Sequence, residues 1–285
     1  MEYISRNSYF RIWTDGVKSM DSIRVAVSGA LGRMGREVCQ TVLATEDMEL
    51  VDSFDTQGTG EDIGTVLGKE KTGVHVRELT PQSLQEHGPQ VMVDFTTPMS
   101  VMGNIEIALQ GGVRPVVGTT GITGVDLKRI AELVKSSAIG ALVAPNFALG
   151  AVLLMQFAAK ASRYFPQAEI IELHHDQKID APSGTALKTA EMITAGRLEQ
   201  PVEKEELLKL PGVRGGLKDG VHIHSVRLSG LVAHQEVIFG GQGQTLTLRH
   251  DSFDRNSFMP GVVLAIRKAL TLQHLVYGLE NILDL

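Results

Sequence analysis

Short apolar runs alternate with amphipathic segments through the first half of the chain. Runs rich in β-branched residues predict buried strands at 23–28, 50–54, 91–95, 115–117 and 140–144. Helical patterns come between them: one at 36–45, one that follows the strand at 91–95 and ends at about 110, and one at 126–136. Because strands that alternate with helices form a parallel sheet, this half predicts an α/β domain whose strand-end loops gather round one crevice.

The pattern changes after a long apolar helix predicted from 149 to about 164. Strand-like runs at 168–173, 221–228, 234–239 and 245–250 are joined by glycine-rich turns, with one helix near 184–196. They predict an α+β domain with a mostly mixed or antiparallel sheet. The charged and glycine-rich segment 199–217 is expected to be an exposed loop. The closing helix, 257–272, and the apolar tail, 275–283, are expected to return to the first domain.

A glycine-rich turn joins the first predicted strand to the first predicted helix. It reads Gly29-Ala30-Leu31-Gly32-Arg33-Met34-Gly35, a G-x-x-G-x-x-G spacing. Glycines are wanted where the backbone turns sharply, approaches a pyrophosphate and lets a helix pack on a strand. Asp55 follows the second strand, where an acid can accept hydrogen bonds from a ribose. We predict a Rossmann-type dinucleotide site; the alternative is a glycine turn that only packs.

Two further strand ends are expected to face the same cofactor. Ligands of open parallel sheets bind beyond the carboxyl ends of the strands. The residues at these two ends are Gly118, Thr119 and Thr120, and then Ala144, Pro145, Asn146 and Phe147.

Two adjacent histidines and a lysine, His174, His175 and Lys178, follow a strand of the second half. Loops at strand ends often carry catalytic groups, and an imidazole can give or take a proton near neutral pH. The alternative is a metal cluster with His222 and His224, because His-x-His on a strand places both rings on one face. No cysteine joins this set and the lysine favours an organic anion, so we predict no metal.

The same loop ends at Ser183, whose side chain can cap the following helix. The free N–H groups of Gly184 and Thr185 then lie at the positive end of the helix dipole, where a carboxylate or phosphate binds. A proton donor, a cation and an amide anion site within one short stretch suit a reaction on a small carboxylic acid.

Composition excludes several other classes of protein. The chain has 285 residues, a prior for about two domains, and its net charge of −6 argues against nucleic-acid binding. The single cysteine, Cys39, excludes an internal disulfide and fits a reducing compartment. The most apolar run, 148–159, is too short to span a bilayer, so we predict no membrane partner. Residues 1–19 are expected to be an upstream extension, with Met20 the start; the alternative is an arm that packs on a neighbouring subunit.

Together these motifs resemble the dihydrodipicolinate reductase family over about 23–283. The run at 172–187, with its H-H-x-x-K-x-D-A-P-S-G-T pattern, is close to diagnostic, and segments 227–239 and 249–258 agree. The resemblance implies a cytoplasmic homotetramer that reduces 4-hydroxy-tetrahydrodipicolinate, a small dicarboxylate, with NADH or NADPH in diaminopimelate and lysine biosynthesis. The alternative is a non-catalytic or differently specific Rossmann NAD(P)-binding protein, which has no reason to place a lysine and a histidine beside a helix N-terminus.

The resemblance also implies domain boundaries and residue roles. An extension, 1–20, precedes a dinucleotide-binding domain, 21–148, completed by 256–285, and a substrate-binding and tetramerisation domain, 149–255. It makes His174 the catalytic proton donor or acceptor and Lys178 the second donor and carboxylate partner. The implied substrate contacts are His175, Ser183, Gly184 and Thr185. The implied cofactor contacts are Gly29, Ala30, Leu31, Gly32, Arg33, Met34, Asp55, Gly118, Thr119, Thr120, Ala144, Pro145, Asn146 and Phe147.

Two positions depart from the family pattern. Where many members have an arginine after the ribose acid, this chain has Thr56 after Asp55. An acid repels a 2′-phosphate and no adjacent guanidinium compensates, so we predict a preference for NADH over NADPH, with Arg33 or Lys69 as alternative phosphate partners. The second departure, Asp176-Gln177, stands where relatives often have basic residues or histidine and is expected to tune substrate affinity.

Overall fold

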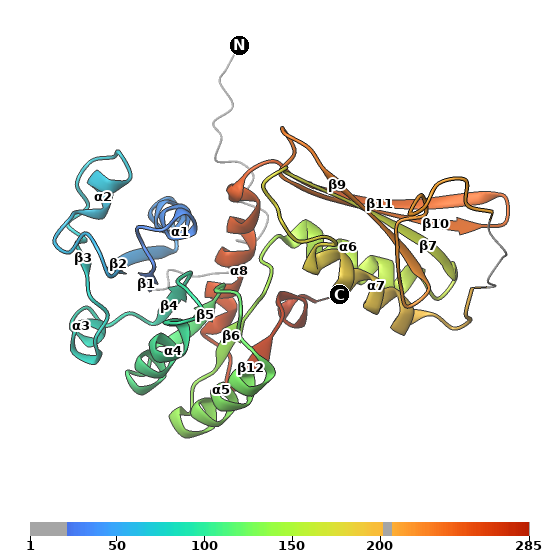
Figure 1. The fold of residues 1–285 in the computed structure, drawn as a ribbon. Coiled ribbons are helices and arrows are strands. Elements are labelled where there is room, and N and C mark those ends of the chain that lie inside the picture. The colour runs from blue at the N-terminus through green and yellow to red at the C-terminus, as the bar shows by residue number, and fades with distance from the viewer. Residues whose placement is uncertain (1–21, 202–206, 285) are drawn as a thin grey trace, which may run out of the picture.

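The computed structural model describes residues 22–201 and 207–284, which form two sheets (Figure 1). The predicted extension, 1–20, with its start at Met20, lies outside the described residues. So does 202–206, a part of the segment predicted as an exposed loop.

The first sheet has seven strands within the described residues, all parallel, in the order β12-β6-β5-β4-β1-β2-β3. Their bounds are β1 Ile23–Ser28, β2 Met48–Phe54, β3 Val76–Arg77, β4 Val91–Asp94, β5 Arg114–Val117, β6 Ala141–Val143 and β12 Leu275–Tyr277. The chain leaves β1 towards β2 and later returns on its other side at β4. Ligands bind at such a reversal of strand order. The predicted Rossmann-type parallel sheet is confirmed.

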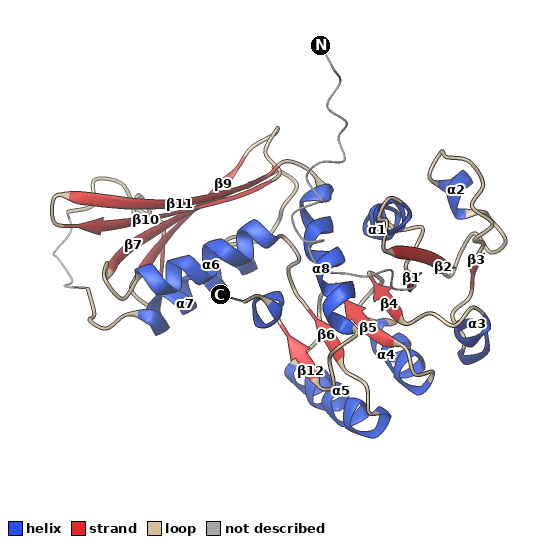
Figure 2. Ribbon diagram, turned by 180° about the vertical axis from the view of Figure 1, so that it is seen from behind, coloured by secondary structure: helices blue, strands red, loops and turns tan. Residues whose placement is uncertain are grey.

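Helices cover both faces of this sheet (Figure 2). They are α1 Arg33–Leu43, α3 Pro81–Glu86, α4 Val101–Gln110, α5 Gly124–Ser137 and α8 Met259–Ala269. Val25 and Val27 of β1 belong to the core that contains α1 and α8. Ala26, between them, packs with Leu84 of α3 and Ala108 of α4. Because side chains alternate along a strand, the sheet is buried on both sides and its strands are apolar throughout.

The edge of this sheet beyond β2 differs from expectation. The sequence pattern predicts a plain loop at 58–73, but the structure has a short helix, α2 Ile63–Val66, there. Asp62 caps α2: its carboxylate accepts hydrogen bonds from the Thr65 N–H at 3.1 Å and the Gly73 N–H at 2.8 Å. The pattern also misses β3 and α3 and starts α1 three residues too late. Elements this short have almost no hydrophobic period, so local pattern does not reveal them.

The second sheet has five strands within the described residues, in the order β11-β10-β7-β9-β8. Their bounds are β7 Gln167–His174, β8 Gly216–Lys218, β9 Val221–Arg227, β10 Ala233–Gly241 and β11 Gln244–Ser252. Only β7 and β9 pair in parallel; the other pairs are antiparallel. The predicted mixed sheet is confirmed, although β8 begins within the last two residues of the predicted loop 199–217. Helices α6 Leu149–Ala161 and α7 Gly184–Gly196 cover one face, and the other face carries no helix (Figure 2).

Helix α6 belongs to the cores of both sheets. Val152 and Met155 pack in the core that contains α8 of the first sheet. Leu154 and Ala158 pack under the second sheet. This helix therefore connects the two sheets. None of the helices within 22–201 and 207–284 combines the length and the apolar character that crossing a membrane requires.

Candidate active site

The glycine turn after β1 is packed so closely that side chains cannot replace two of its glycines. A Cβ atom at Gly29, whose φ is +79°, would lie 2.6 Å from the carbonyl oxygen of Phe95. A Cβ atom at Gly35 would lie 1.9 Å from the Gly29 carbonyl oxygen. Gly32 precedes α1 without a capping side chain, which leaves the first N–H groups of α1 for a ligand. The turn therefore has the shape that a pyrophosphate requires.

The acid predicted to bind a ribose lies against this turn. The Asp55 carboxylate accepts a hydrogen bond from the Leu31 N–H at 3.0 Å and another from the Gln57 N–H at 3.3 Å. Asp55 is half-buried and Thr56 is exposed. A carboxylate held at this strand end is placed to accept ribose hydroxyl groups.

A buried aspartate organises the loops after β4 and β5. Asp94 is fully buried and its carboxylate accepts hydrogen bonds from Thr96 Oγ1, Thr119 Oγ1 and Asn104 Nδ2, each at 2.7 Å. Sequence reasoning missed Asp94 and Asn104; the available signal was a polar residue at the end of a buried strand. A Cβ atom at Gly118 would lie 2.1 Å from the Phe95 ring. The loop after β5 is thus fixed close to the glycine turn.

The remaining predicted cofactor residues differ in burial: some are buried, some half-buried and some exposed. The Phe147 ring is buried against Phe95, with centroids 5.6 Å apart, and Asn146 Oδ1 accepts a hydrogen bond from the Ala148 N–H at 2.9 Å. These contacts give Phe147 and Asn146 structural roles in addition to any cofactor contact. The buried set is Ala30, Thr119, Ala144 and Phe147; Leu31, Met34, Gly118 and Asn146 are half-buried; Gly32, Arg33, Thr120 and Pro145 are exposed.

The second half of the candidate site lies where β7 ends. His174 is the last residue of β7, and its Nδ1 contacts the carboxylate of Glu172, a fully buried side chain two residues earlier. Residues two apart on a strand share a face, so the contact follows from local geometry. Burial acts to raise the pKa of Glu172, but hydrogen bonds from His174, Arg227 and Ser225 outweigh it and bring that pKa to about 2.

The lysine of the motif is held by an acid in the same loop. Lys178 Nζ lies 2.8 Å from both carboxylate oxygens of Asp180, whose side chain is 66% exposed. The hydrogen bond from Lys178 lowers the pKa of Asp180. The Lys178 ammonium thus binds the exposed carboxylate of Asp180 in this position, and a ligand carboxylate offers it the same kind of charge-assisted hydrogen bond. His175 is exposed beside it.

The helix that follows the loop is capped as its sequence predicts. Ser183 is buried and its Oγ accepts a hydrogen bond from the Ala186 N–H at 3.2 Å. The N–H groups of Gly184 and Thr185 have no hydrogen-bond partner within residues 22–201 and 207–284. Two unpaired N–H groups at a helix N-terminus suit a carboxylate.

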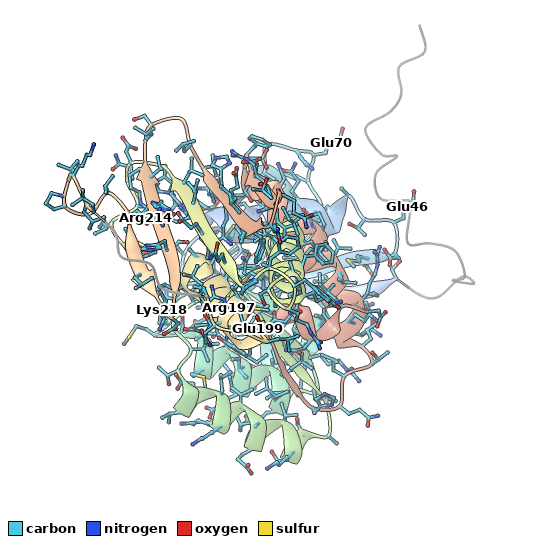
Figure 3. The ribbon with its side chains drawn as sticks, turned by 90° about the vertical axis from the view of Figure 1, so that its right-hand side faces the viewer. Glu46, Glu70, Arg197, Glu199, Arg214 and Lys218 are labelled. Carbon is cyan, nitrogen blue, oxygen red and sulfur yellow. The ribbon has the colours of Figure 1, made fainter. Side chains whose placement is uncertain are left out.

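The alternative metal cluster does not form from these histidines. His222 and His224 lie on the face of β9 opposite to Arg227, and therefore on the opposite face of the sheet from His174. His224 Nε2 lies 2.8 Å from Glu169, which also contacts Arg214, labelled in Figure 3. His234, in turn, contacts Asp251 through Nδ1 at 2.7 Å and accepts the Val232 N–H at Nε2, a structural arrangement.

Comparison with known proteins gives one consistent result for both halves of the chain. The family model described as dihydrodipicolinate reductase, N-terminus, matches residues 23–147, and the C-terminus model matches 150–283. The chain is 54% identical over 269 residues to 4-hydroxy-tetrahydrodipicolinate reductase of Desulfitobacterium hafniense (strain DSM 10664 / DCB-2), covering 93% of this chain and 100% of that protein. It is 52% identical over 265 residues to the Moorella thermoacetica (strain ATCC 39073 / JCM 9320) protein of the same name, covering 92% and 98%.

Solved structures agree with the sequence matches. The dipicolinate-bound dihydrodipicolinate reductase from Paenisporosarcina sp. TG-14 is 48% identical, has a TM-score of 0.82 and covers 92% of this chain and 100% of its own. An amine dehydrogenase from Mycobacterium smegmatis is 12% identical with a TM-score of 0.66, covers 89% of this chain and 94% of its own, and shares the fold alone.

Proposed function

The chain belongs to the dihydrodipicolinate reductase family, and on that premise we propose that it reduces 4-hydroxy-tetrahydrodipicolinate to tetrahydrodipicolinate, a step of diaminopimelate and lysine biosynthesis. It is an NAD(P)H-dependent oxidoreductase. The observation that supports this reaction best is the juxtaposition, after one strand, of an imidazole, an ammonium and two unpaired helix N–H groups.

The residues of the first sheet fit a dinucleotide. Gly29, Gly35 and Gly118 let the glycine turn pack closely on the neighbouring loops, because a Cβ atom at each would clash with protein atoms. The first N–H groups of α1, after Gly32, carry no side-chain cap and can bind a pyrophosphate. Asp55 supplies the acceptor for ribose hydroxyls. The nicotinamide, when bound, supplies the hydride that reduces the substrate ring.

The residues of the second sheet bind the substrate and move the proton. The Gly184 and Thr185 N–H groups bind one carboxylate of the substrate. Lys178 leaves its ion pair with Asp180 and binds a substrate carboxylate in its place. Loss of the 4-hydroxyl group as water gives a conjugated ring, and charge builds on the nitrogen of that ring as the hydride arrives. His174 donates a proton to the ring through Nε2. General acid help of this kind contributes about 10²–10⁴-fold to the rate. His175 and Ser183 complete the proposed substrate contacts.

NADH is the proposed cofactor of choice. The Asp55 carboxylate repels a 2′-phosphate, and Thr56 offers no compensating charge. Arg77 is the last residue of β3, beside β2, but its guanidinium forms ion pairs with Asp52 and Glu86 and lies over the Phe54 ring. The described neighbourhood of Asp55 therefore supports discrimination against NADPH.

We also propose a homotetramer built through the helix-free face of the second sheet. Ile171, Leu173, Val226 and Ile238 are half-buried apolar residues on that face, and no element of the described chain covers them. On this division, 21–148 with 256–285 binds the dinucleotide and 149–255 binds substrate and assembles the tetramer. A cytoplasmic location is part of the same proposal, supported by a single, buried cysteine, Cys39.

The test is steady-state reduction of freshly generated 4-hydroxy-tetrahydrodipicolinate with NADH and with NADPH. We expect turnover, a higher kcat/KM with NADH, and a loss of about 100-fold or more in kcat/KM for Lys178→Ala because an anion anchor and proton donor disappear. Lys135→Ala, which removes the exposed ion pair with Glu132 on α5, is the matched control and keeps wild-type rates.

Two outcomes would contradict this assignment. A wild type that binds NADH without turnover would make the chain a non-catalytic dinucleotide-binding protein. A higher kcat/KM with NADPH would leave the reductase standing and refute the argument from Asp55 and Thr56.

A further inference from the structure

Beneath His174 lies a buried ion pair that the reaction itself does not require. The Glu172 side chain has no exposed surface, the His174 side chain is 15% exposed and the Arg227 side chain is 18% exposed. Glu172 and His174 belong to β7, and Arg227 belongs to the neighbouring strand β9, where it pairs in register with His174. The three side chains thus share the helix-covered face of the sheet, at the end where the loop 175–183 begins; this loop is called the substrate loop below.

The guanidinium of Arg227 donates two hydrogen bonds to the carboxylate of Glu172. Nη2 lies 2.8 Å from Glu172 Oε1 and Nη1 lies 3.0 Å from Oε2. The same Oε2 contacts His174 Nδ1. A carboxylate fixed in this way can hold the imidazole in one orientation, with Nδ1–H donating to it and Nε2 left for the substrate.

Arg227 also reaches the loop that carries the catalytic lysine. Its Nη2 donates to the carbonyl oxygen of Asp180 at 2.7 Å, and its Nη1 to the carbonyl oxygen of Val226 at 2.8 Å. The Asp180 side chain is the partner of Lys178. One guanidinium therefore connects the carboxylate under His174 with the backbone beside Lys178.

Stability alone does not explain such a pair. Taking two charges out of water costs several kcal/mol per ion, and apolar residues of similar volume often serve a fold equally well or better. Catalysis, in contrast, is sensitive to placement, since a shift of about 1 Å can cost about 100-fold in rate.

We propose that Glu172 and Arg227 are positioning residues of the reductase: Glu172 fixes the ring of His174, and Arg227 fixes Glu172 while anchoring the Lys178 loop through Asp180. The inference rests on the proposed function. The hydrogen bonds that bring the pKa of Glu172 to about 2, against the effect of burial, keep this carboxylate charged at neutral pH.

The experiment compares Glu172→Gln, Arg227→Met, the double variant and Arg227→Lys. Glu172→Gln leaves the charge of Arg227 without a partner, and Arg227→Met leaves the charge of Glu172 without one, so the Tm of each falls. The double variant removes both charges, so its Tm recovers. We expect kcat to stay about 100-fold below wild type in all three, while the Kd for NADH changes less than about twofold, because neither residue touches the dinucleotide domain.

Arg227→Lys keeps the positive charge. A lysine ammonium cannot make the two parallel hydrogen bonds to Glu172 and also donate to the carbonyl oxygen of Asp180 as the guanidinium does. We expect it to retain most of the Tm and still to lose about tenfold or more in kcat. Proton NMR adds a readout that a structural role would not move: a downfield Nδ1–H signal, assigned by its loss in His174→Ala, is present in wild type and lost in Glu172→Gln.

Asp47→Asn is the matched control, because it removes another two-point contact, with Arg267 at 2.7 and 2.8 Å, far from the substrate loop. It should leave kcat unchanged. If kcat recovers with the Tm in the double variant, or if Arg227→Lys has wild-type kcat, the pair is structural and the inference is wrong. If the wild type shows no reductase turnover, the proposed function fails instead.

Discussion

Two buried carboxylates, one in each half of the candidate site, hold the residues around them in place. Asp94 is fully buried and accepts hydrogen bonds from Thr96 and Thr119, in the loops after β4 and β5. Glu172 is fully buried and contacts His174 and Arg227. A buried charge is tolerated only when hydrogen bonds satisfy it, so each acid forces its neighbours into one arrangement. Both halves of the site are therefore rigid at the level of single side chains.

Glu172 predicts a pH-dependent difference between wild type and Glu172→Gln. Its pKa of about 2 in the folded protein lies below the ordinary 4.5, so its ionised form stabilises the fold fully above about pH 4.5 and this contribution is lost as the pH falls towards 2. Urea unfolding should show wild type more stable by up to about 3 kcal/mol at pH 7, shrinking below pH 4.5. A difference that stays constant between pH 7 and 3.5 would show that the charge is not responsible.

Two glycines predict opposite effects of the same substitution. Gly35→Ala places a Cβ atom 1.9 Å from a backbone oxygen, so it should lower the free energy of unfolding by about 3 kcal/mol and abolish NADH binding. Gly103→Ala, inside α4, meets nothing within 4 Å and should raise it by about 0.5–1 kcal/mol through lower chain entropy. Thermal unfolding of both variants measures this, and a stable Gly35→Ala that binds NADH would refute the packing argument.

The helices at the site differ in how their N-termini are satisfied. α1 begins after Gly32 with no side-chain cap, which suits a pyrophosphate. α7 begins after Ser183, which satisfies one N–H and leaves those of Gly184 and Thr185 open. α5, which is not part of the candidate site, has a complete capping box formed by Thr123 and Asp126. An N-terminus with open N–H groups is a place where an anion can bind.

Capping predicts a matched pair of variants. Ser183→Ala and Thr123→Ala should each cost about 1 kcal/mol of stability, because each removes one N-cap hydrogen bond. Only Ser183→Ala should also raise the KM for the dicarboxylate, since α7, unlike α5, directly follows the loop 175–183 that is proposed to bind it. Equal KM values in the two variants would remove Ser183 from the proposed substrate contacts.

In the whole molecule, helices connect the two sheets: α6 packs into both cores (Figure 1), and Met192 of α7 packs against the first core. Under the proposed function, this packing joins the dinucleotide-binding sheet to the substrate-binding sheet. The helix-free face of the second sheet is the proposed assembly surface, and it carries the half-buried apolar residues named above.

Assembly predicts the effect of a charge in the middle of that face. Ile171→Lys, on the central strand β7, should convert the proposed tetramer into smaller species, because an unpaired ammonium is costly to bury. Size-exclusion chromatography with light scattering measures the mass. Val125→Lys, at an exposed apolar residue of α5, is the control and should leave the mass unchanged. An Ile171→Lys protein of wild-type mass would place the interface elsewhere.

The sequence by itself determined the features that are local. Alternating apolar runs indicated the parallel sheet, the spacing of glycines indicated the turn after β1, and the pattern from His174 to Thr185 indicated the family, because burial period and turn chemistry act over a few residues. Only the tertiary structure decided which distant residues meet. Glu172 and Arg227 are 55 positions apart, and Asp94 and Thr119 are 25 apart. Their contacts depend on the order of strands in each sheet, which no local pattern specifies.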